Sequence, residues 1–288
     1  MNIFNLHTHS IYSDGTHEPR AYINQAIKQD FSSIGFSEHS PLPFKNNFSI
    51  LESQLNDYCK HIQLLKNEFE GKLNIYLSME FDYIPKISEN FKPLSDQYNF
   101  DYIIGSVHLV ANEGKDGLWF IDGPKVETYD KGLETIFKGN IKKAVEAYFY
   151  QMCLMIEEEK PDIVGHLDKI KMHNNGRYFS ENEGWYKELI TKTLKLIADA
   201  GIIMEVNTRG IYKKRCNSLF PDENILRESL EMNIPVTVTT DAHRPEEIAF
   251  HYLEALQLLQ KTGYHEIMGF DGKDWRSVAI SDLISSIK

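Results

Sequence analysis

Short apolar runs alternate along the chain with longer segments of helical periodicity. The apolar or alternating pattern of β-strands predicts strands at residues 2–8, 33–37, 74–82, 102–109, 163–167, 202–207 and 235–240. Between them, apolar residues that recur every three or four positions predict helices at residues 18–30, 50–69, 140–160, 184–200, 222–232 and 245–262. Strands that alternate with helices in this way are typical of a parallel α/β fold.

Two connections are longer than a turn between a strand and a helix requires. They cover residues 40–50 and residues 110–139. Both follow predicted strands that end in candidate metal ligands, described below. We therefore expect both connections to lie over the mouth of the site, where they could form a lid and recognise the substrate. No linker rich in Pro, Gly or Ser and no internal repeat divides the sequence, so residues 1–288 are interpreted as one domain.

Composition and charge narrow the class of protein. The 288 residues are 42% hydrophobic and 25% charged, as in ordinary globular proteins, and no apolar run approaches the ~20 residues that span a bilayer. A net charge of −11 argues against nucleic-acid binding but not against a small phosphorylated ligand. The widely spaced cysteines, Cys59, Cys153 and Cys216, and the lack of a recognisable signal peptide indicate a reducing compartment. We therefore expect a cytoplasmic protein without membrane or nucleic-acid partners, and the sequence leaves its oligomeric state open.

Histidine and acidic residues gather where the predicted strands end. The first run closes with a His-x-His pair at residues 7–9, and the last with an Asp-x-His pair at residues 241–243. Residues i and i+2 of a strand point to the same side, so each pair can direct two ligands at one metal ion. The candidate ligands at the strand ends are His7, His9, His39, Glu80, His108, His166, Asp241 and His243.

Acidic neighbours of these ligands receive supporting roles. Glu38 and His39 are adjacent and face opposite sides of a strand, so His39 is the expected ligand and Glu38 its support. Glu80 lies in an apolar strand, where a carboxylate needs a partner such as a metal ion, and Asp82 is a weaker candidate on the same side. Asp14, in the turn after the first strand, is on its own typical of a turn or capping residue.

The distribution of the candidates favours a closed barrel over an open sheet. An open parallel sheet concentrates its site at one switch point and uses only a few strand ends. In a barrel, every strand end converges on one mouth. Because candidate residues follow all the predicted strands, we expect a barrel of about seven βα units.

Arg209 is a candidate for anion binding because it follows the strand at residues 202–207. A guanidinium group there can bind an anion in a bidentate manner, although an ordinary surface ion pair is equally compatible with the pattern. The sequence has neither a phosphate-binding glycine loop nor a Gly-x-Ser-x-Gly motif, which argues against a serine hydrolase.

Taken in order, these residues resemble the PHP family, the polymerase and histidinol phosphatase superfamily. The family pattern is matched by His7-Thr8-His9, Asp14, His17, Glu38-His39, Glu80, His108, His166 and Asp241-Ala242-His243. The resemblance extends from residue 7 to residue 243 and implies a distorted (β/α)7 barrel. The stretches at residues 36–40, 105–108 and 165–168 are most similar to those of the monofunctional histidinol-phosphate phosphatases within the family.

The resemblance also implies a centre of three divalent or trivalent transition-metal ions. The implied ligand sets are His7, His9, Glu80 and Asp241 for the first ion, Glu80, His108 and His166 for the second, and His17, His39 and His243 for the third. Imidazole and carboxylate ligands without thiolate suit Zn, Mn or Fe.

The implied activity is hydrolysis of L-histidinol phosphate to L-histidinol and inorganic phosphate, with attack by a metal-activated hydroxide. The expected catalytic residues are Asp241, Arg209 and His243, and the expected substrate contacts are Arg209, Glu113 and Asp14. Two alternatives stay open. The same chemistry could act on phosphotyrosine, a nucleoside monophosphate or a phosphodiester, or the chain could be a non-catalytic metal-binding module. The segment at residues 110–139 argues against bulky polymers, and the complete ligand set argues against the second alternative.

Overall fold

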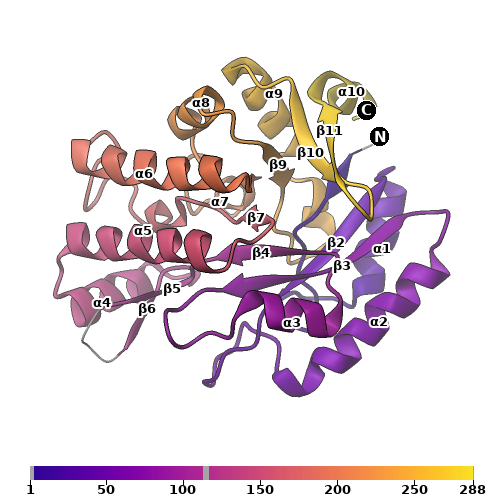
Figure 1. Ribbon diagram of the computed structural model, residues 1–288, viewed down its shortest axis with the longest axis horizontal. Coiled ribbons are helices and arrows are strands. Elements are labelled where there is room, and N and C mark those ends of the chain that lie inside the picture. Colours follow the sequence, from indigo (N-terminus) through magenta and orange to yellow (C-terminus); the bar gives the residue numbers. More distant parts are fainter. Residues whose placement is uncertain (1–2, 113–116, 288) are drawn as a thin grey trace.

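Seven parallel strands form a nearly closed barrel in the computed structural model, which describes residues 3–112 and 117–287 (Figure 1). In spatial order the strands are β1 (Phe4–Asn5), β2 (Ser33–His39), β3 (Asn74–Asp82), β4 (Tyr102–Ser106), β7 (Ile163–Val164), β8 (Ile203–Asn207) and β9 (Val236–Thr239). A parallel bridge between Thr8 and Ala242 joins the first strand region to the last. The predicted barrel is therefore confirmed, although the first and fifth strands are shorter than expected.

Helices on the outside of the barrel connect successive strands. They are α1 (Pro19–Lys28), α2 (Leu55–Glu68), α3 (Phe91–Tyr98), α5 (Ile141–Glu158), α6 (Gly184–Ala200), α8 (Glu223–Glu231) and α9 (Tyr252–Thr262), with short 3₁₀ helices η1 (Glu52–Gln54), η2 (Lys169–Lys171) and η3 (Pro245–Ala249). The side chains of Asn140 and Asp222 accept hydrogen bonds from the first turns of α5 and α8, the usual stabilisation of a helix start. The eight-residue helix α3 was not predicted, because its apolar pattern is short and contains Pro93.

The segment at residues 110–139 is not one long loop, as the sequence analysis proposed. Strands β5 (Leu109–Ala111) and β6 (Leu118–Phe120) pair as an antiparallel ribbon, and helix α4 (Val126–Phe137) follows them. Trp119 joins the segment to the main hydrophobic core, since its indole is fully buried and donates to the Tyr129 carbonyl oxygen at 2.9 Å.

The ribbon packs against the other long connection, at residues 40–50. The rings of Phe48 and Phe120 stack at 5.3 Å, and Phe48 also contacts the His39 ring edge-to-face at 5.3 Å. Leu42 and Phe44 pack on the same small hydrophobic cluster, which also contains Ile84, Leu109 and Leu118. The two connections therefore form one apolar wall beside His39.

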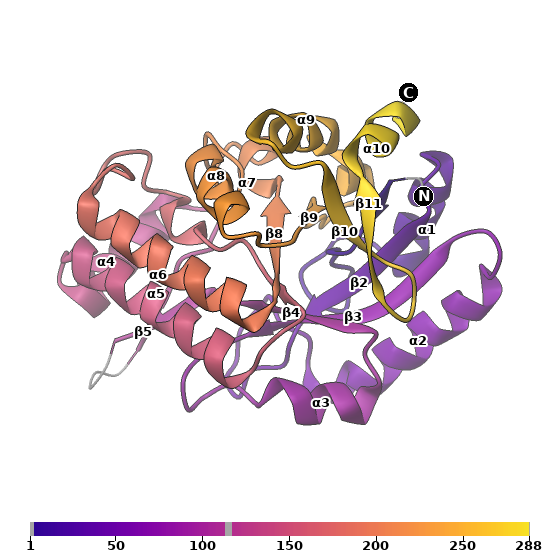
Figure 2. The ribbon, with the colours of Figure 1, turned by 45° about the horizontal axis from the view of Figure 1, so that its top comes forward.

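The opposite end of the barrel is covered by a hairpin that the sequence analysis missed. Strands β10 (Glu266–Phe270) and β11 (Trp275–Ala279) pair antiparallel and lead into α10 (Ile280–Ser286). Figure 2 shows this hairpin beside β2 and β3. The Tyr76 hydroxyl donates to the Phe270 carbonyl oxygen at 2.9 Å, and the rings of Tyr102 and Trp275 lie 5.7 Å apart. Because Tyr76 and Tyr102 lie near the starts of their strands, the hairpin closes the amino ends of the barrel.

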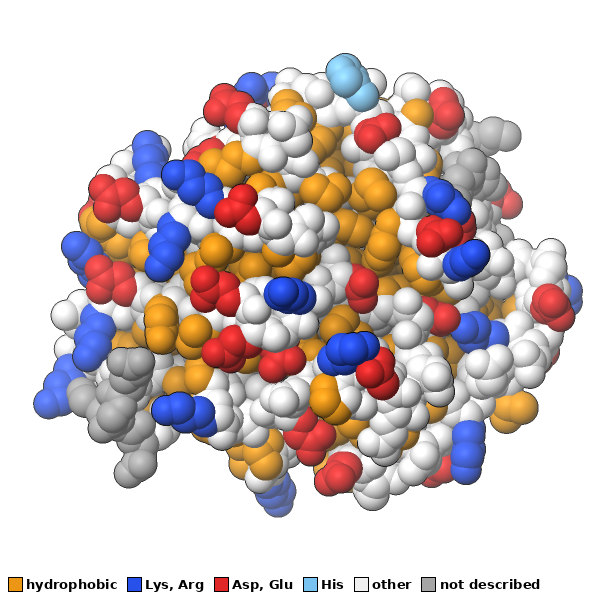
Figure 3. Space-filling model, viewed as in Figure 1, with side chains coloured by type: hydrophobic (Ala, Val, Ile, Leu, Met, Phe, Trp, Pro, Cys, Tyr) orange, Lys and Arg blue, Asp and Glu red, His pale blue; other side chains and the backbone are white. Residues whose placement is uncertain are grey.

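Charged side chains of both signs are interspersed on the face drawn in Figure 3, without a concentration of basic residues. In the part of the chain that the structure describes, the helices are too short or too polar to cross a membrane.

Candidate metal centre

The closure of the barrel places the two paired motifs side by side. His9 donates its backbone N–H to the Ala242 carbonyl oxygen at 2.9 Å, and Ala242 donates to the His7 carbonyl oxygen at 3.2 Å. Thr8 and Ala242 form this parallel bridge. Because successive side chains of a strand point to opposite faces, the residues before and after Thr8 and Ala242 point to the face opposite to theirs. His7 and His9 therefore project toward Asp241 and His243, as the i, i+2 spacing predicted.

His7, His9 and Asp241 form the first group of candidate ligands. The Nε2 atoms of the two imidazoles lie 3.0 Å apart, and Asp241 Oδ1 lies 3.4 Å from His9 Nε2 and 3.9 Å from His7 Nε2. All three residues are buried. Their donor atoms lie within 4.8 Å of one another, close enough to share one ion.

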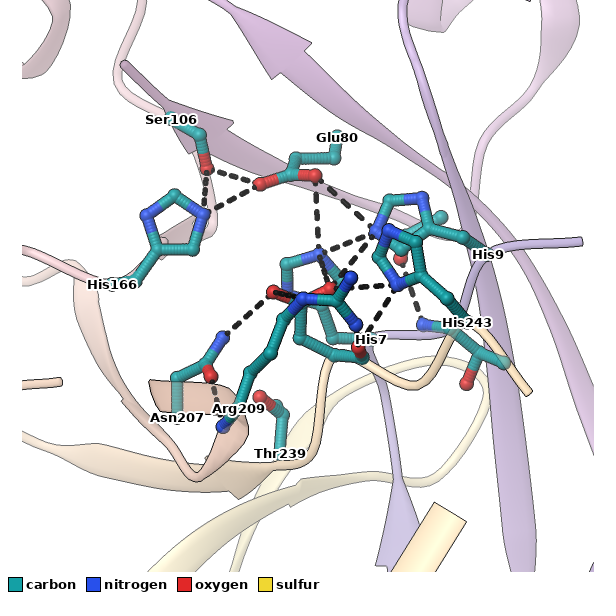
Figure 4. A network of polar contacts seen from close by, with 12 residues as sticks. His7, His9, Glu80, Ser106, His166, Asn207, Arg209, Thr239 and His243 are labelled. Atoms are coloured by element: carbon teal, nitrogen blue, oxygen red, sulfur yellow. Dashed lines mark hydrogen bonds and ion pairs between the residues drawn. The ribbon is translucent and has the colours of Figure 1, made fainter. Parts of the chain in front are cut away.

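Glu80 faces this group with one oxygen and a second group with the other (Figure 4). Its Oε2 lies 3.2 Å from His7 Nε2 and 3.0 Å from His39 Nδ1. Its Oε1 lies 3.0 Å from His166 Nε2 and 3.6 Å from His108 Nε2. The two oxygens of one carboxylate thus reach two sets of imidazoles, so Glu80 would be shared by ions bound at both sets.

Asp14, His39 and His243 form a third group with His9. Asp14 Oδ1 lies 2.9 Å from His243 Nε2 and 3.7 Å from His39 Nε2. The turn that carries Asp14 lies tightly against the first strand, because a Cβ atom at Gly15 would lie only 2.1 Å from the His9 carbonyl oxygen. The sequence analysis assigned Asp14 to the substrate, whereas the structure places its carboxylate among the candidate ligands.

His17 is not among the grouped candidate ligands in the described residues, so its assignment as a ligand stays a prediction. Thr16, which is itself exposed, donates both its backbone N–H and its hydroxyl to the His243 carbonyl oxygen and so fixes the turn before His17. His17 is exposed, and its Nδ1 lies 2.7 Å from the Thr16 hydroxyl.

Buried carboxylates behind the candidate ligands fix the orientation of two imidazoles. Glu205 Oε1 lies 2.5 Å from His7 Nδ1, and Asp82 Oδ1 lies 2.8 Å from His108 Nδ1. In each case the Nε2 atom is left to face the centre, as expected for a metal-binding histidine held by a carboxylate. Asp82 was expected as a weak ligand, and Glu205 was missed.

Glu38 supports the turn at residues 10–15 rather than an imidazole. It accepts hydrogen bonds from the Ser10 backbone N–H at 3.0 Å, from the Ser10 hydroxyl at 2.5 Å, and from the Ser13 hydroxyl. Glu38 therefore stabilises the turn that positions Asp14, and not the His39 imidazole as the sequence suggested.

Arg209, at the start of the short helix α7 (Arg209–Tyr212), borders the same centre. Its Nη1 donates to the Asp241 carbonyl oxygen at 2.8 Å, and its Nε lies 3.8 Å from Asp241 Oδ2. Figure 4 draws Arg209 in the same network of polar contacts as His7, His9 and Glu80. Glu113, the other residue assigned to the substrate, lies outside the residues that the structure describes.

The donor set fits divalent metal ions. Glu80 Oε2 and Asp241 Oδ1 are buried and form no hydrogen bond with any residue in the described ranges, although a buried carboxylate oxygen without a partner is costly. Burial lowers the pKa of His39 to about 3, so its imidazole is neutral and able to bind a metal. Burial raises the pKa of Glu80, but the surrounding histidines, His7 first, hold it well below the usual range, so the carboxylate is ionised.

Comparisons with known proteins identify the family of the chain. Residues 5–209 match the family model described as PHP domain. The histidinol-phosphatase of Lactococcus lactis is 26% identical over 282 residues, which cover 94% of this chain and 96% of that protein. The histidinol-phosphatase of Bacillus subtilis is 26% identical over 81% of this chain and 90% of its own length. The crystal structure of the Lactococcus lactis histidinol phosphate phosphatase, complexed with Zn, L-histidinol and phosphate, has a TM-score of 0.67 at 23% identity, over 95% of this chain and 98% of that one.

Proposed function

Because the chain belongs to the PHP domain family, we propose that it is a metal-dependent phosphatase that hydrolyses L-histidinol phosphate to L-histidinol and inorganic phosphate. The convergence of the 7–9 and 241–243 pairs on the bridging carboxylate of Glu80 supports this proposal most directly. The named relatives support the choice of substrate, since they match over most of their length.

The three groups of candidate ligands would hold three ions, of Zn, Mn or Fe. The proposed sets are His7, His9, Glu80 and Asp241 for the first ion, Glu80, His108 and His166 for the second, and Asp14, His39 and His243 for the third, where Asp14 replaces His17. His39 also lies within reach of Glu80 and His108. Such ions supply a strong nucleophile from water near neutral pH and neutralise charge on the phosphoryl oxygens.

The remaining steps fall to side chains of the chain itself. Arg209 would bind a phosphoryl oxygen through its Nε, which is buried and has no hydrogen-bond partner in the described residues. Burial raises the pKa of Asp241, but Arg209 and His7 hold it well below the usual range, so Asp241 is ionised. It would therefore assist protonation of the leaving alkoxide by orienting a water molecule, and not by donating a proton of its own.

The test compares phosphate release from L-histidinol phosphate, p-nitrophenyl phosphate and a nucleoside monophosphate by metal-reconstituted protein. We expect kcat/KM for L-histidinol phosphate to exceed the others by at least ~10³-fold, about 4 kcal/mol of transition-state discrimination. Comparable weak rates on all three would contradict this choice of substrate and leave a phosphatase of another specificity.

A further inference from the structure

Lys169 is a buried ammonium group at the edge of the metal centre. It lies on η2, is 2% exposed, and its Nζ lies 2.9 Å from Asp122 Oδ2. The next acidic or imidazole groups are farther away, His108 Nε2 at 3.4 Å and Asp241 Oδ2 at 3.8 Å. An ammonium group has three N–H donors, so in the described part of the chain Asp122 is the single carboxylate that satisfies one of them at close range.

A metal ion bound at His108 would add positive charge beside the ammonium group of Lys169. The Nε2 atom of His108 faces Glu80 and His166, so a bound ion would occupy the lone pair that now faces Lys169. The ammonium group would then lie beside an ion of the same sign, and the repulsion between two buried positive charges is large. Asp122 Oδ2 lies 3.7 Å from His108 Nε2 and 2.9 Å from Lys169 Nζ, so it places one negative charge between them, and a phosphate dianion would add further negative charge there.

The carboxylate of Asp241 marks where that anion would bind. Its Oδ1 faces the imidazoles, 3.4 Å from His9 Nε2 and 3.3 Å from His243 Nδ1. Its Oδ2 faces two cations that come from different loops, Lys169 Nζ at 3.8 Å and Arg209 Nε at 3.8 Å. The two cations thus border the ligand cluster on one side, and in the described residues the Nε of Arg209 has no hydrogen-bond partner.

From this arrangement, and resting on the proposed function, we propose that Lys169 binds the phosphoryl group of the substrate together with Arg209. The guanidinium group offers a planar pair of donors and the ammonium group a compact charge, so the two can bind different oxygens of one phosphate dianion. Asp122 follows the β5–β6 ribbon and acts as a positioning residue that holds the ammonium group against the centre.

Lys171, on the same short helix, shows what a purely structural buried lysine looks like in this protein. Its Nζ lies 2.6 Å from Asp168 Oδ2, 3.4 Å from Asp222 Oδ2 and 3.7 Å from Glu181 Oε2. Three carboxylates therefore surround that ammonium group, whereas Lys169 has one close carboxylate and faces the candidate ligands.

The experiment measures the affinity of inorganic phosphate for metal-loaded protein by calorimetry, with bound metal determined on the same samples. The variants are Lys169→Met, Asp122→Asn and the double variant, in which the buried pair is removed together so that no single charge is left without a partner. Lys66→Met is the matched control, because Lys66 forms a similar ion pair with Asp101, at 2.8 Å, away from the candidate ligands.

We expect the double variant to bind phosphate at least about tenfold more weakly than Asp122→Asn, with the same metal content, and Lys66→Met to bind it as the unmodified protein does. Equal phosphate affinity in the double variant and in Asp122→Asn would overturn the proposal, since Lys169 would then serve only to neutralise Asp122. Fewer bound ions in the double variant than in Asp122→Asn would also overturn it, since the lysine would then act on the metal centre.

This test is separate from the test of the substrate. Inorganic phosphate is the probe, so a protein that fails to hydrolyse L-histidinol phosphate but loses phosphate affinity without Lys169 would contradict only the proposed substrate. Efficient turnover of L-histidinol phosphate by the double variant, with phosphate affinity unchanged, would contradict only the role of Lys169.

Discussion

The two ends of the barrel use the same strands for opposite purposes. Tyr76, near the start of β3, packs on Phe270 and has its hydroxyl satisfied, whereas Glu80, four residues later on the same strand, is buried with an oxygen that forms no hydrogen bond in the described residues. On β4, Tyr102 packs on the covering hairpin, and His108 follows the strand into the ligand cluster. The amino end thus buries aromatic surface, which stabilises the fold, while the carboxyl end buries ionisable groups that require a ligand.

The largest expected effect is that of Glu80→Gln at the carboxyl end. Because Glu80 contacts two groups of imidazoles, its loss removes a ligand that both share. We expect phosphate release to fall by at least ~10³-fold and bound metal to decrease. Circular dichroism and a cooperative urea transition should show that the metal-free variant still folds, although it loses the attraction to the imidazoles that holds the pKa of the Glu80 carboxyl low. A variant that is inactive because it unfolds would contradict the assignment of fold stability to the amino end of the barrel and of metal binding to the carboxyl end.

Phe270→Ala at the amino end should produce the opposite result. Phe270 is buried against Tyr76, Tyr102 and Trp275, so truncation leaves a cavity. We expect a loss of about 3 kcal/mol in the free energy of unfolding from urea titration. The kcat and KM of the folded fraction should not change, and a change in either would show that the covering hairpin reaches the active site.

A comparison of Asp14→Asn with His17→Asn tests the corrected ligand set at the mouth. Asp14 lies 2.9 Å from His243 Nε2, whereas His17 is exposed and contacts Thr16. We expect Asp14→Asn to lower kcat/KM about a hundredfold or more, because the loss of a ligand costs at least as much as the loss of a group that only supports a ligand. His17→Asn is the matched control and should retain full activity, and the reverse order would restore His17 as the ligand.

Glu205→Gln should have the smallest effect, because Glu205 acts on the centre through His7. An amide can still accept a hydrogen bond but no longer stabilises the imidazole electrostatically, and we expect an about tenfold lower metal affinity. Competition with a chromogenic chelator measures it. Unchanged affinity would mean that the contact at 2.5 Å serves only the packing of the strand ends.

The strand ends were predictable because the signal is local. A carboxylate within an apolar strand identifies Glu80, and the same pattern marks Glu205, between Met204 and Val206. The hairpin at residues 266–279 also carried a signal, since Asp271-Gly272 is a common turn between two strands.

Other features depend on contacts between distant segments and had no local signal. The choice between Asp14 and His17 depends on how closely Gly15 approaches the His9 carbonyl oxygen and on the hydrogen bonds of Thr16 to His243. Lys169 and Asp122 come from different loops, and their pairing follows only from the way the ribbon lies beside η2.

The most direct test of the account is a metal titration of chelator-stripped protein with L-histidinol phosphate as substrate. We expect no phosphate release from the metal-free protein, and activity that rises with added Zn or Mn until three ions are bound per chain. Full activity without bound metal, or binding of three ions without any phosphate release, would contradict the assignment of the strand-end cluster as a catalytic metal centre.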